Sequence, residues 1–170
     1  MNGRQVCKLL LIMLLSYWAA HLSIYFVSDN LRTAVSELLG IFVYIIAVIC
    51  AMSFVMFTYV DNTAKDLTDL RNDVDREKYK VVQKKLSSLK FEIIANAAVI
   101  LVFFGLEYII RTVVVHVFLE RALKKTWLIE TIGVSLRFSC FSVIIYAASS
   151  QILGFLIAVE FREQIANNRK

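Results

Sequence analysis

Long apolar runs alternate with short charged breaks along this chain. Four runs contain no Asp, Glu, Lys or Arg, and they cover residues 9–27, 38–60, 93–106 and 138–159. A bilayer core about 30 Å thick needs about 20 apolar residues of helix to cross. Three runs reach that length, and the third does so when it continues through Ile109–Ile110. The pattern predicts an all-α integral membrane protein with four transmembrane helices, at 9–27, 38–60, 93–113 and 138–159.

The first run is expected to stay in the mature protein. It is longer than the apolar region of about 7–15 residues that is typical of a signal peptide. Tyr25-Phe26-Val27 is also unlike a cleavage site, which needs small residues.

Composition agrees with a membrane protein and gives no sign of an enzyme. The chain is 59% hydrophobic and 19% charged, whereas a soluble domain has about 45–50% apolar and about 25% charged residues. Its three cysteines have no metal-ligand spacing, and nucleophile–base pairs, paired catalytic carboxylates and glycine-rich phosphate loops are absent from the sequence. We therefore expect no catalytic residues, no metal and no cofactor.

The basic residues predict the orientation in the membrane, because cytoplasmic flanks collect Lys and Arg. With an internal N-terminus, the inside segments 1–8, 61–92 and 160–170 hold 13 basic residues. The outside segments then hold four, namely Arg32, Arg121, Lys124 and Lys125. This asymmetry predicts that both termini lie in the cytoplasm.

Segment 61–92 is the one sizeable polar element and has helical periodicity. Apolar residues recur at helical spacing on both sides of a break at 75–78, so we predict that the second and third helices extend into the cytoplasm as a helical hairpin. Its first arm is acidic and its second arm is basic. The hairpin is either a solvated spacer or the docking surface for a cytosolic protein partner. The candidate partner-binding residues are Asp66, Asp69, Asp73, Lys78, Lys80, Lys84 and Lys85.

Lipid headgroups are an alternative partner for these lysines, but the aspartates could not bind headgroups. No direct binding of nucleic acid is expected. The C-terminal segment 160–170 is expected to be a cytoplasmic tail.

Three charged residues lie within the apolar part of the third and fourth helices. Glu107 and Arg111 have the spacing of an ion pair within one helix, and Arg137 should come level with them. This intramembrane charge cluster is either a structural clamp near the outer interface or part of a gate. Segment 114–136 should then lie at or beyond that interface.

Small residues recur every four positions on the fourth helix, at Ser150, Gly154 and Ala158. Such residues let helix backbones approach closely, within one chain or between chains. Together with polar residues that have no evident partner, such as Gln151, the ladder suggests a homo-oligomer.

The four spans, the inside termini and the charged arms 61–74 and 76–92 resemble the small four-helix membrane subunits of bacterial antiphage defence systems, particularly the Kiwa type. The resemblance is one of architecture. It implies a homo-oligomer that responds to phage at the envelope and engages a cytosolic DNA-binding partner. We expect a non-enzymatic membrane scaffold or sensor that recruits or regulates a cytosolic partner; the alternative is a small channel or a pore-forming effector.

Overall fold

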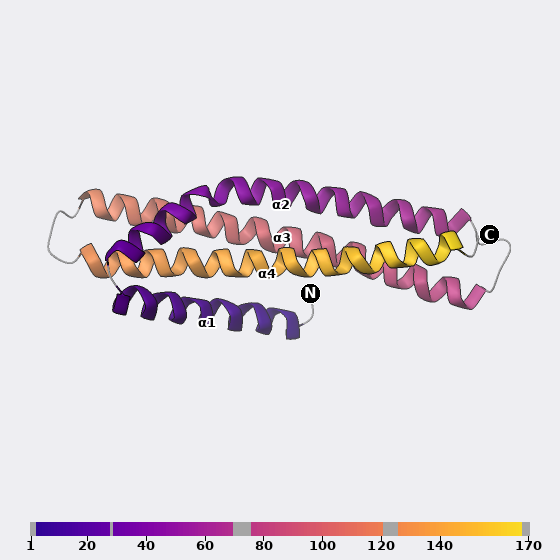
Figure 1. The fold of residues 1–170 in the computed structure, drawn as a ribbon, viewed down its shortest axis with the longest axis horizontal. Coiled ribbons are helices and arrows are strands. Elements are labelled where there is room, and N and C mark those ends of the chain that lie inside the picture. Colours follow the sequence, from indigo (N-terminus) through magenta and orange to yellow (C-terminus); the bar gives the residue numbers. More distant parts are fainter. Residues whose placement is uncertain (1–2, 28, 70–75, 121–125, 168–170) are drawn as a thin grey trace. The chain divides into compact units, whose positions relative to one another are not determined.

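The computed structural model describes residues 3–27, 29–69, 76–120 and 126–167, and all of them are helical. The four helices follow one another along the chain (Figure 1). They are α1 (Gly3–Val27), α2 (Asp29–Asp69), α3 (Arg76–Glu120) and α4 (Thr126–Asn167). The described residues contain no strand. The predicted all-α class is therefore confirmed.

Each helix is long and apolar enough to cross a membrane, which marks the chain as a membrane protein. The qualifying stretches are Gln5–Phe26, Thr33–Leu67, Lys80–Val114 and Trp127–Gln164. Helices α2, α3 and α4 contain 41, 45 and 42 residues. At 1.5 Å per residue each is about 60–70 Å long, roughly twice the thickness of a bilayer core. Each of these helices is therefore too long to be covered by hydrocarbon along its whole length.

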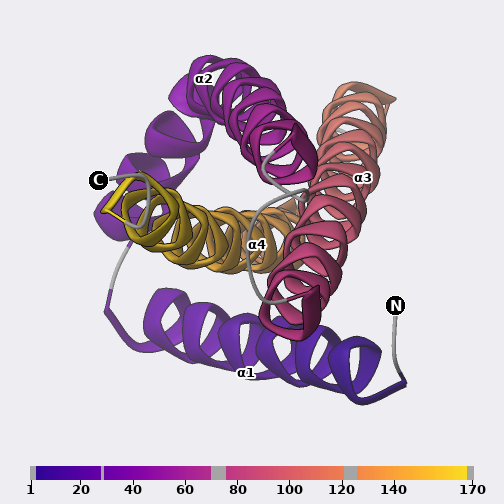
Figure 2. The same cartoon turned by 90° about the vertical axis from the view of Figure 1, so that its right-hand side faces the viewer.

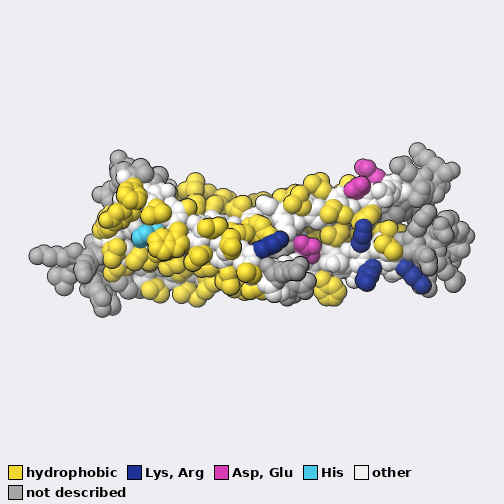
Figure 3. Space-filling model, turned by 90° about the horizontal axis from the view of Figure 1, so that it is seen from below, with side chains coloured by type: hydrophobic (Ala, Val, Ile, Leu, Met, Phe, Trp, Pro, Cys, Tyr) yellow, Lys and Arg dark blue, Asp and Glu magenta, His cyan; other side chains and the backbone are white. Residues whose placement is uncertain are grey.

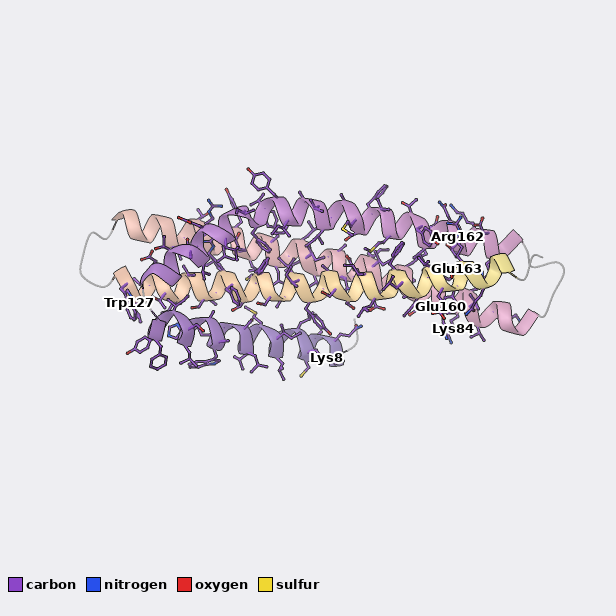
Figure 4. All side chains as sticks on the ribbon, viewed as in Figure 1. Lys8, Lys84, Trp127, Glu160, Arg162 and Glu163 are labelled. Carbon is purple, nitrogen blue, oxygen red and sulfur yellow. The ribbon has the colours of Figure 1, made fainter. Side chains whose placement is uncertain are left out.

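Two segments that the sequence separates from the spans are continuous with the helices. In segment 114–136, the described residues belong to the end of α3 and the beginning of α4, where Trp127 lies (Figure 4). In segment 160–170, α4 stays helical through Asn167. The predicted break at 75–78 lies partly outside the described residues, and α3 begins at Arg76.

The chain forms two compact units. Unit 1 comprises Met1–Ala47 and Val99–Tyr146, and unit 2 comprises Val48–Ala98 and Ala147–Lys170.

Unit 1 has a small apolar core that joins α1, α2 and α4. Ile24, Leu39 and Val134 form its buried cluster. Phe42 of α2 contacts Phe141 of α4 edge to face, with ring centroids 4.5 Å apart. Because aromatic pairs prefer this geometry, the contact adds to the apolar burial that holds the two helices together.

Unit 2 is a three-helix bundle built from the end of α2, the beginning of α3 and the end of α4. Figure 2 looks onto these three segments. Its buried core residues are Met56, Val60, Leu67, Leu86, Leu89, Ile93 and Ala158. They come from all three helices, so the bundle includes a third helix that the predicted two-helix hairpin lacks.

Hydrophobic side chains also cover much of the outer surface. They dominate the face seen in Figure 3. Helix α1 is an example, since Leu10, Leu14 and Leu15 are each more than half exposed. A soluble monomer rarely exposes such extended apolar surface, whereas lipid covers it without cost.

Candidate functional site

Unit 2 gathers charged side chains where its three helices leave their apolar stretches. Asp61 of α2 follows the last residue of the run 38–60 directly. It accepts hydrogen bonds from Lys90 Nζ of α3 at 2.5 Å and from Lys65 Nζ at 2.8 Å. Lys90 also lies over the ring of Phe57, 5.3 Å from its centroid. The acidic side chain is thus neutralised within the unit, and its contact with Lys90 joins α2 to α3.

Helix α4 is tied to the other two helices by a second group of contacts. Arg162 lies over the Tyr59 ring of α2, 5.0 Å from its centroid, and approaches Asp66 at 3.9 Å. Lys85 of α3 lies 5.5 Å from the centroid of the Phe161 ring. Cation–π contacts contribute about 0.5–1 kcal/mol each at exposed sites. The residues after Val159 are therefore a packed part of unit 2.

A layer of hydrogen bonds crosses unit 2 inside the apolar stretches. Ser53 of α2 donates to Gln151 Oε1 of α4 at 2.7 Å, and Gln151 Nε2 donates to the Ile93 carbonyl of α3 at 3.0 Å. Ser150 donates to Glu92 Oε1 at 3.2 Å. Side-chain hydrogen bonds of this kind hold helices together in lipid, where water offers no competing partner. Gln151 is thus paired within the chain and gives no reason to expect a second copy.

The small-residue ladder is used within one chain. A Cβ atom added at Gly154 would lie 3.2 Å from Leu89 Cδ2 of α3. Ala158 is fully buried in the core of unit 2, and Ser150 is bonded to Glu92. Ser150 and Gly154 contact side chains of α3, and Ala158 lies in the core that α2 and α3 form with α4, so all three residues of the ladder are used within the chain.

The predicted docking residues lie on different parts of unit 2. Lys80 and Lys84 are exposed on α3 and form no ion pair with a described residue. Lys85 is exposed and contacts Phe161, while Asp66 is partly exposed near Arg162. The side chains of Asp69, Asp73 and Lys78 lie outside the described residues.

In unit 1 the structure brings together two of the three predicted intramembrane charges. Arg137 Nε donates to Glu107 Oε1 at 2.6 Å, and the residues are 7% and 2% exposed. Arg111 is exposed, and within the described part of the chain it forms no ion pair with Glu107. The predicted pairing within α3 is replaced by one between α3 and α4. The pair is buried, whereas the clamp interpretation of the sequence puts these charges near the outer interface.

Sequence reasoning placed Arg137 level with Glu107, but it did not identify the individual contacts that join the helices of unit 2, and it missed a buried row of hydroxyls on α4. Thr131, Ser135 and Ser139 are fully buried, and each donates to the carbonyl of the residue four positions earlier. Their spacing of four is visible in the sequence, but Thr131 and Ser135 lie in segment 114–136, which was predicted to be interfacial. Likewise, Phe161 and Arg162 continue the helical period of α4 beyond Val159, and this periodicity could have indicated that the helix extends past the predicted span.

The described residues offer no cluster of three or more His, Cys, Asp or Glu side chains that could hold a metal ion. Comparison with protein-family models, with curated proteins and with solved structures finds no match.

Proposed function

We propose that this chain is a non-enzymatic membrane scaffold or sensor that recruits or regulates a cytosolic protein through unit 2. In this proposal the four helices cross a bacterial inner membrane, and both termini lie in the cytoplasm. The apolar length of the helices and the distribution of the 19 basic residues along the chain support this topology.

The packed polar end of unit 2 is the observation that carries the proposal. Helices α2, α3 and α4 continue as helices beyond the runs 38–60, 93–106 and 138–159. Leu67 of α2 and Leu86 of α3 lie beyond these runs and are buried in the core that the three helices have in common. A solvated spacer has no need of a common core or of cation–π contacts between its helices. A surface that binds a specific partner benefits from this preorganisation, because fewer side chains have to be ordered on binding.

The charges that remain exposed define the docking surface that we propose. Asp61 is neutralised by Lys65 and Lys90, so it is not available to a partner. Lys80 and Lys84 are exposed without an ion pair among the described residues, and Asp66 has only a long contact to Arg162. Together with Asp69, Asp73 and Lys78, these side chains would present both signs of charge.

The antiphage role and the homo-oligomer remain part of the proposal. The architectural resemblance to Kiwa-type membrane subunits suggests that the cytosolic partner is a DNA-binding protein. The small-residue ladder and Gln151 no longer support an oligomer, because both are used within one chain. Subunit number is therefore best measured directly, by native mass spectrometry of the detergent-extracted protein.

The alternative function as a small channel has less support. A conduit needs polar side chains that face water, whereas Glu107 and Arg137 bond to each other and are buried. The hydroxyls of Thr131, Ser135 and Ser139 bond to their own helix. Ion flux through liposomes that contain the purified protein would revive the channel hypothesis.

Reversal of the acidic arm tests the docking surface. The triple variant Asp66→Lys, Asp69→Lys, Asp73→Lys should abolish co-purification of the cytosolic partner and abolish activity, while membrane insertion and subunit number stay as in wild type. Glu37→Lys is the matched control, since this exposed α2 carboxylate belongs to unit 1. If the triple variant keeps its partner and full activity, unit 2 is a spacer and the proposal fails.

A further inference from the structure

One exposed face of α3 runs without interruption from basic to apolar residues. Lys80, Lys84, Ser87, Phe91 and Ile94 follow one another at spacings of four, three, four and three, which places them on one side of the helix. All five are exposed. The opposite side of α3 carries the core residues Leu86, Leu89 and Ile93.

The exposed apolar residues locate the edge of the hydrocarbon layer on this face. Phe91 is 72% exposed and Ile94 is 50% exposed, which is unfavourable in water but not against acyl chains. With Phe91 at the edge, Ser87 and Ser88 lie about 5–6 Å further along α3, within a headgroup layer about 5–8 Å thick. Lys84 lies about 10 Å from Phe91 along the axis, a few ångströms beyond that layer.

The polar side chains at this level are not used inside unit 2. Lys84 has no ion pair with a described residue, in contrast to Lys65 and Lys90, which both contact Asp61. Ser87 and Ser88 are exposed, and no described residue is hydrogen-bonded to either hydroxyl. By comparison, Thr58 and Thr63 donate to carbonyls of their own helix. A cationic group and two donors therefore stay available to a ligand beside the membrane.

The exposed acidic side chains of α4 in the same unit do not form an ion pair with Lys84. Glu160 and Glu163 are exposed on α4, and Figure 4 marks them together with Lys84 and Arg162. Neither carboxylate forms an ion pair with Lys84. A ligand for this position must supply negative charge and several oxygen acceptors at headgroup level.

We propose that Lys84, Ser87 and Ser88 bind the headgroup of an anionic phospholipid of the cytoplasmic leaflet, with Phe91 against its acyl chains. Lys80 adds attraction from one turn further out. The site rests on the membrane insertion put forward under the proposed function. Its direct continuity with the apolar surface of Phe91 and Ile94 favours a lipid over an acidic protein at Lys84, because a soluble partner would not reach those two residues. This assignment takes Lys84 out of the proposed docking surface, which keeps Asp66, Asp69, Asp73, Lys78 and Lys80.

Lipid titration followed by native mass spectrometry tests the site. The full chain in detergent is titrated with dioleoylphosphatidylglycerol or with dioleoylphosphatidylcholine, which share acyl chains and differ in headgroup charge. We expect tighter binding of phosphatidylglycerol, and an affinity about fivefold lower for Lys84→Gln, since a lysine near the surface contributes about that factor. Ser87→Ala together with Ser88→Ala should lower it further. Lys65→Gln is the matched control, because this lysine is 71% exposed but paired with Asp61, and it should leave binding unchanged.

Three results would overturn the inference. Equal affinity for the two lipids would remove the headgroup preference, and an unchanged Lys84→Gln variant would remove the site. The third result is binding of a polyglutamate peptide to the wild type but not to the double variant Lys80→Glu, Lys84→Glu, together with no preference between the two lipids. This result would assign the face to an acidic protein.

Extraction of membranes with alkaline carbonate distinguishes failure of this inference from failure of the proposed function. Release of the chain from membranes would contradict membrane insertion itself, whereas a retained chain without preference for phosphatidylglycerol contradicts only the lipid site.

Discussion

Single residues in this protein differ in importance according to what their side chains meet. Glu107 and Arg111 are one helical turn apart and carry opposite charges, yet only Glu107 is buried, against Arg137. A buried ion pair is favourable mainly because each charge removes the cost of leaving the other unpaired. The three charges of the predicted cluster therefore have different energetic roles, although the sequence presents them as equivalent.

We predict that Glu107→Gln lowers the free energy of unfolding by about 3–5 kcal/mol, because it leaves the Arg137 guanidinium buried without its acid. Arg111→Gln, on an exposed position of the same helix, should stay within about 0.5 kcal/mol of wild type. Thermal unfolding in detergent, followed by circular dichroism, measures both. The double variant Glu107→Leu, Arg137→Leu should recover much of the loss. Equal stability of Glu107→Gln and wild type would show that water reaches the pair.

Replacement by alanine should have different effects on the free energy of unfolding at two glycines. A Cβ atom at Gly133 of α4 would lie 2.6 Å from Val114 Cγ2 of α3, whereas nothing lies within 4 Å of a Cβ atom at Gly40. Gly133→Ala should cost about 1–3 kcal/mol through overpacking, and the added change Val114→Ala should relieve it. Gly40→Ala should be neutral or stabilising by up to about 1 kcal/mol, because alanine favours helix. The same unfolding experiment decides, and a stable Gly133→Ala would contradict the close approach.

At the scale of elements, α4 shows how a helix acquires its role from its neighbours. In unit 2, Gly154 lies against Leu89 of α3, and Ala158 is buried in the shared core. Phe161 and Arg162 contact α3 and α2. The ladder of small residues is compatible with a contact between chains as much as within one. The structure shows it in use within unit 2, so enlarging Gly154 is expected to disturb packing within this unit.

Gly154→Leu is predicted to lower stability by about 1–3 kcal/mol, because the new side chain would collide with Leu89. Subunit number, measured by native mass spectrometry, should not change. The compensating change Leu89→Ala should restore part of the stability. Leu153→Ala is the control, since Leu153 is the neighbouring α4 residue and is 63% exposed. If Gly154→Leu changes the subunit number but not the free energy of unfolding, the ladder lies between chains instead.

At the scale of the whole molecule, helix length and the distribution of charge are the features on which the proposed topology depends. Helices α2, α3 and α4 are about twice as long as a bilayer core is thick. The basic residues gather in 1–8, 61–92 and 160–170, which the proposed topology puts in the cytoplasm. Unit 2 combines the end of α2, the beginning of α3 and the end of α4, so two of these three basic segments belong to it.

Cysteine labelling in intact cells should test this topology. After replacement of Cys7, Cys50 and Cys140, an impermeant thiol reagent should not reach Asp73→Cys until the inner membrane is opened. The same reagent should label Leu123→Cys from outside. Labelling of Asp73→Cys in intact cells would reverse the orientation and remove unit 2 as a cytosolic docking surface.

The sequence by itself determined the class and the coarse layout of this protein. Apolar runs of membrane length and charged breaks suffice to predict four long helices, because hydrophobic length depends on composition and not on how the helices pack. The polar character of 61–92 follows in the same way.

Which side chains meet could not be predicted, since periodicity assigns a residue to a helix face but does not say which helix covers that face. Only the tertiary structure decided that Glu107 pairs with Arg137, that Gln151 bonds across unit 2, and that Phe161 and Arg162 complete a three-helix bundle. The physical reason is that each contact joins positions between 30 and 103 residues apart, and their proximity depends on the packing of whole helices.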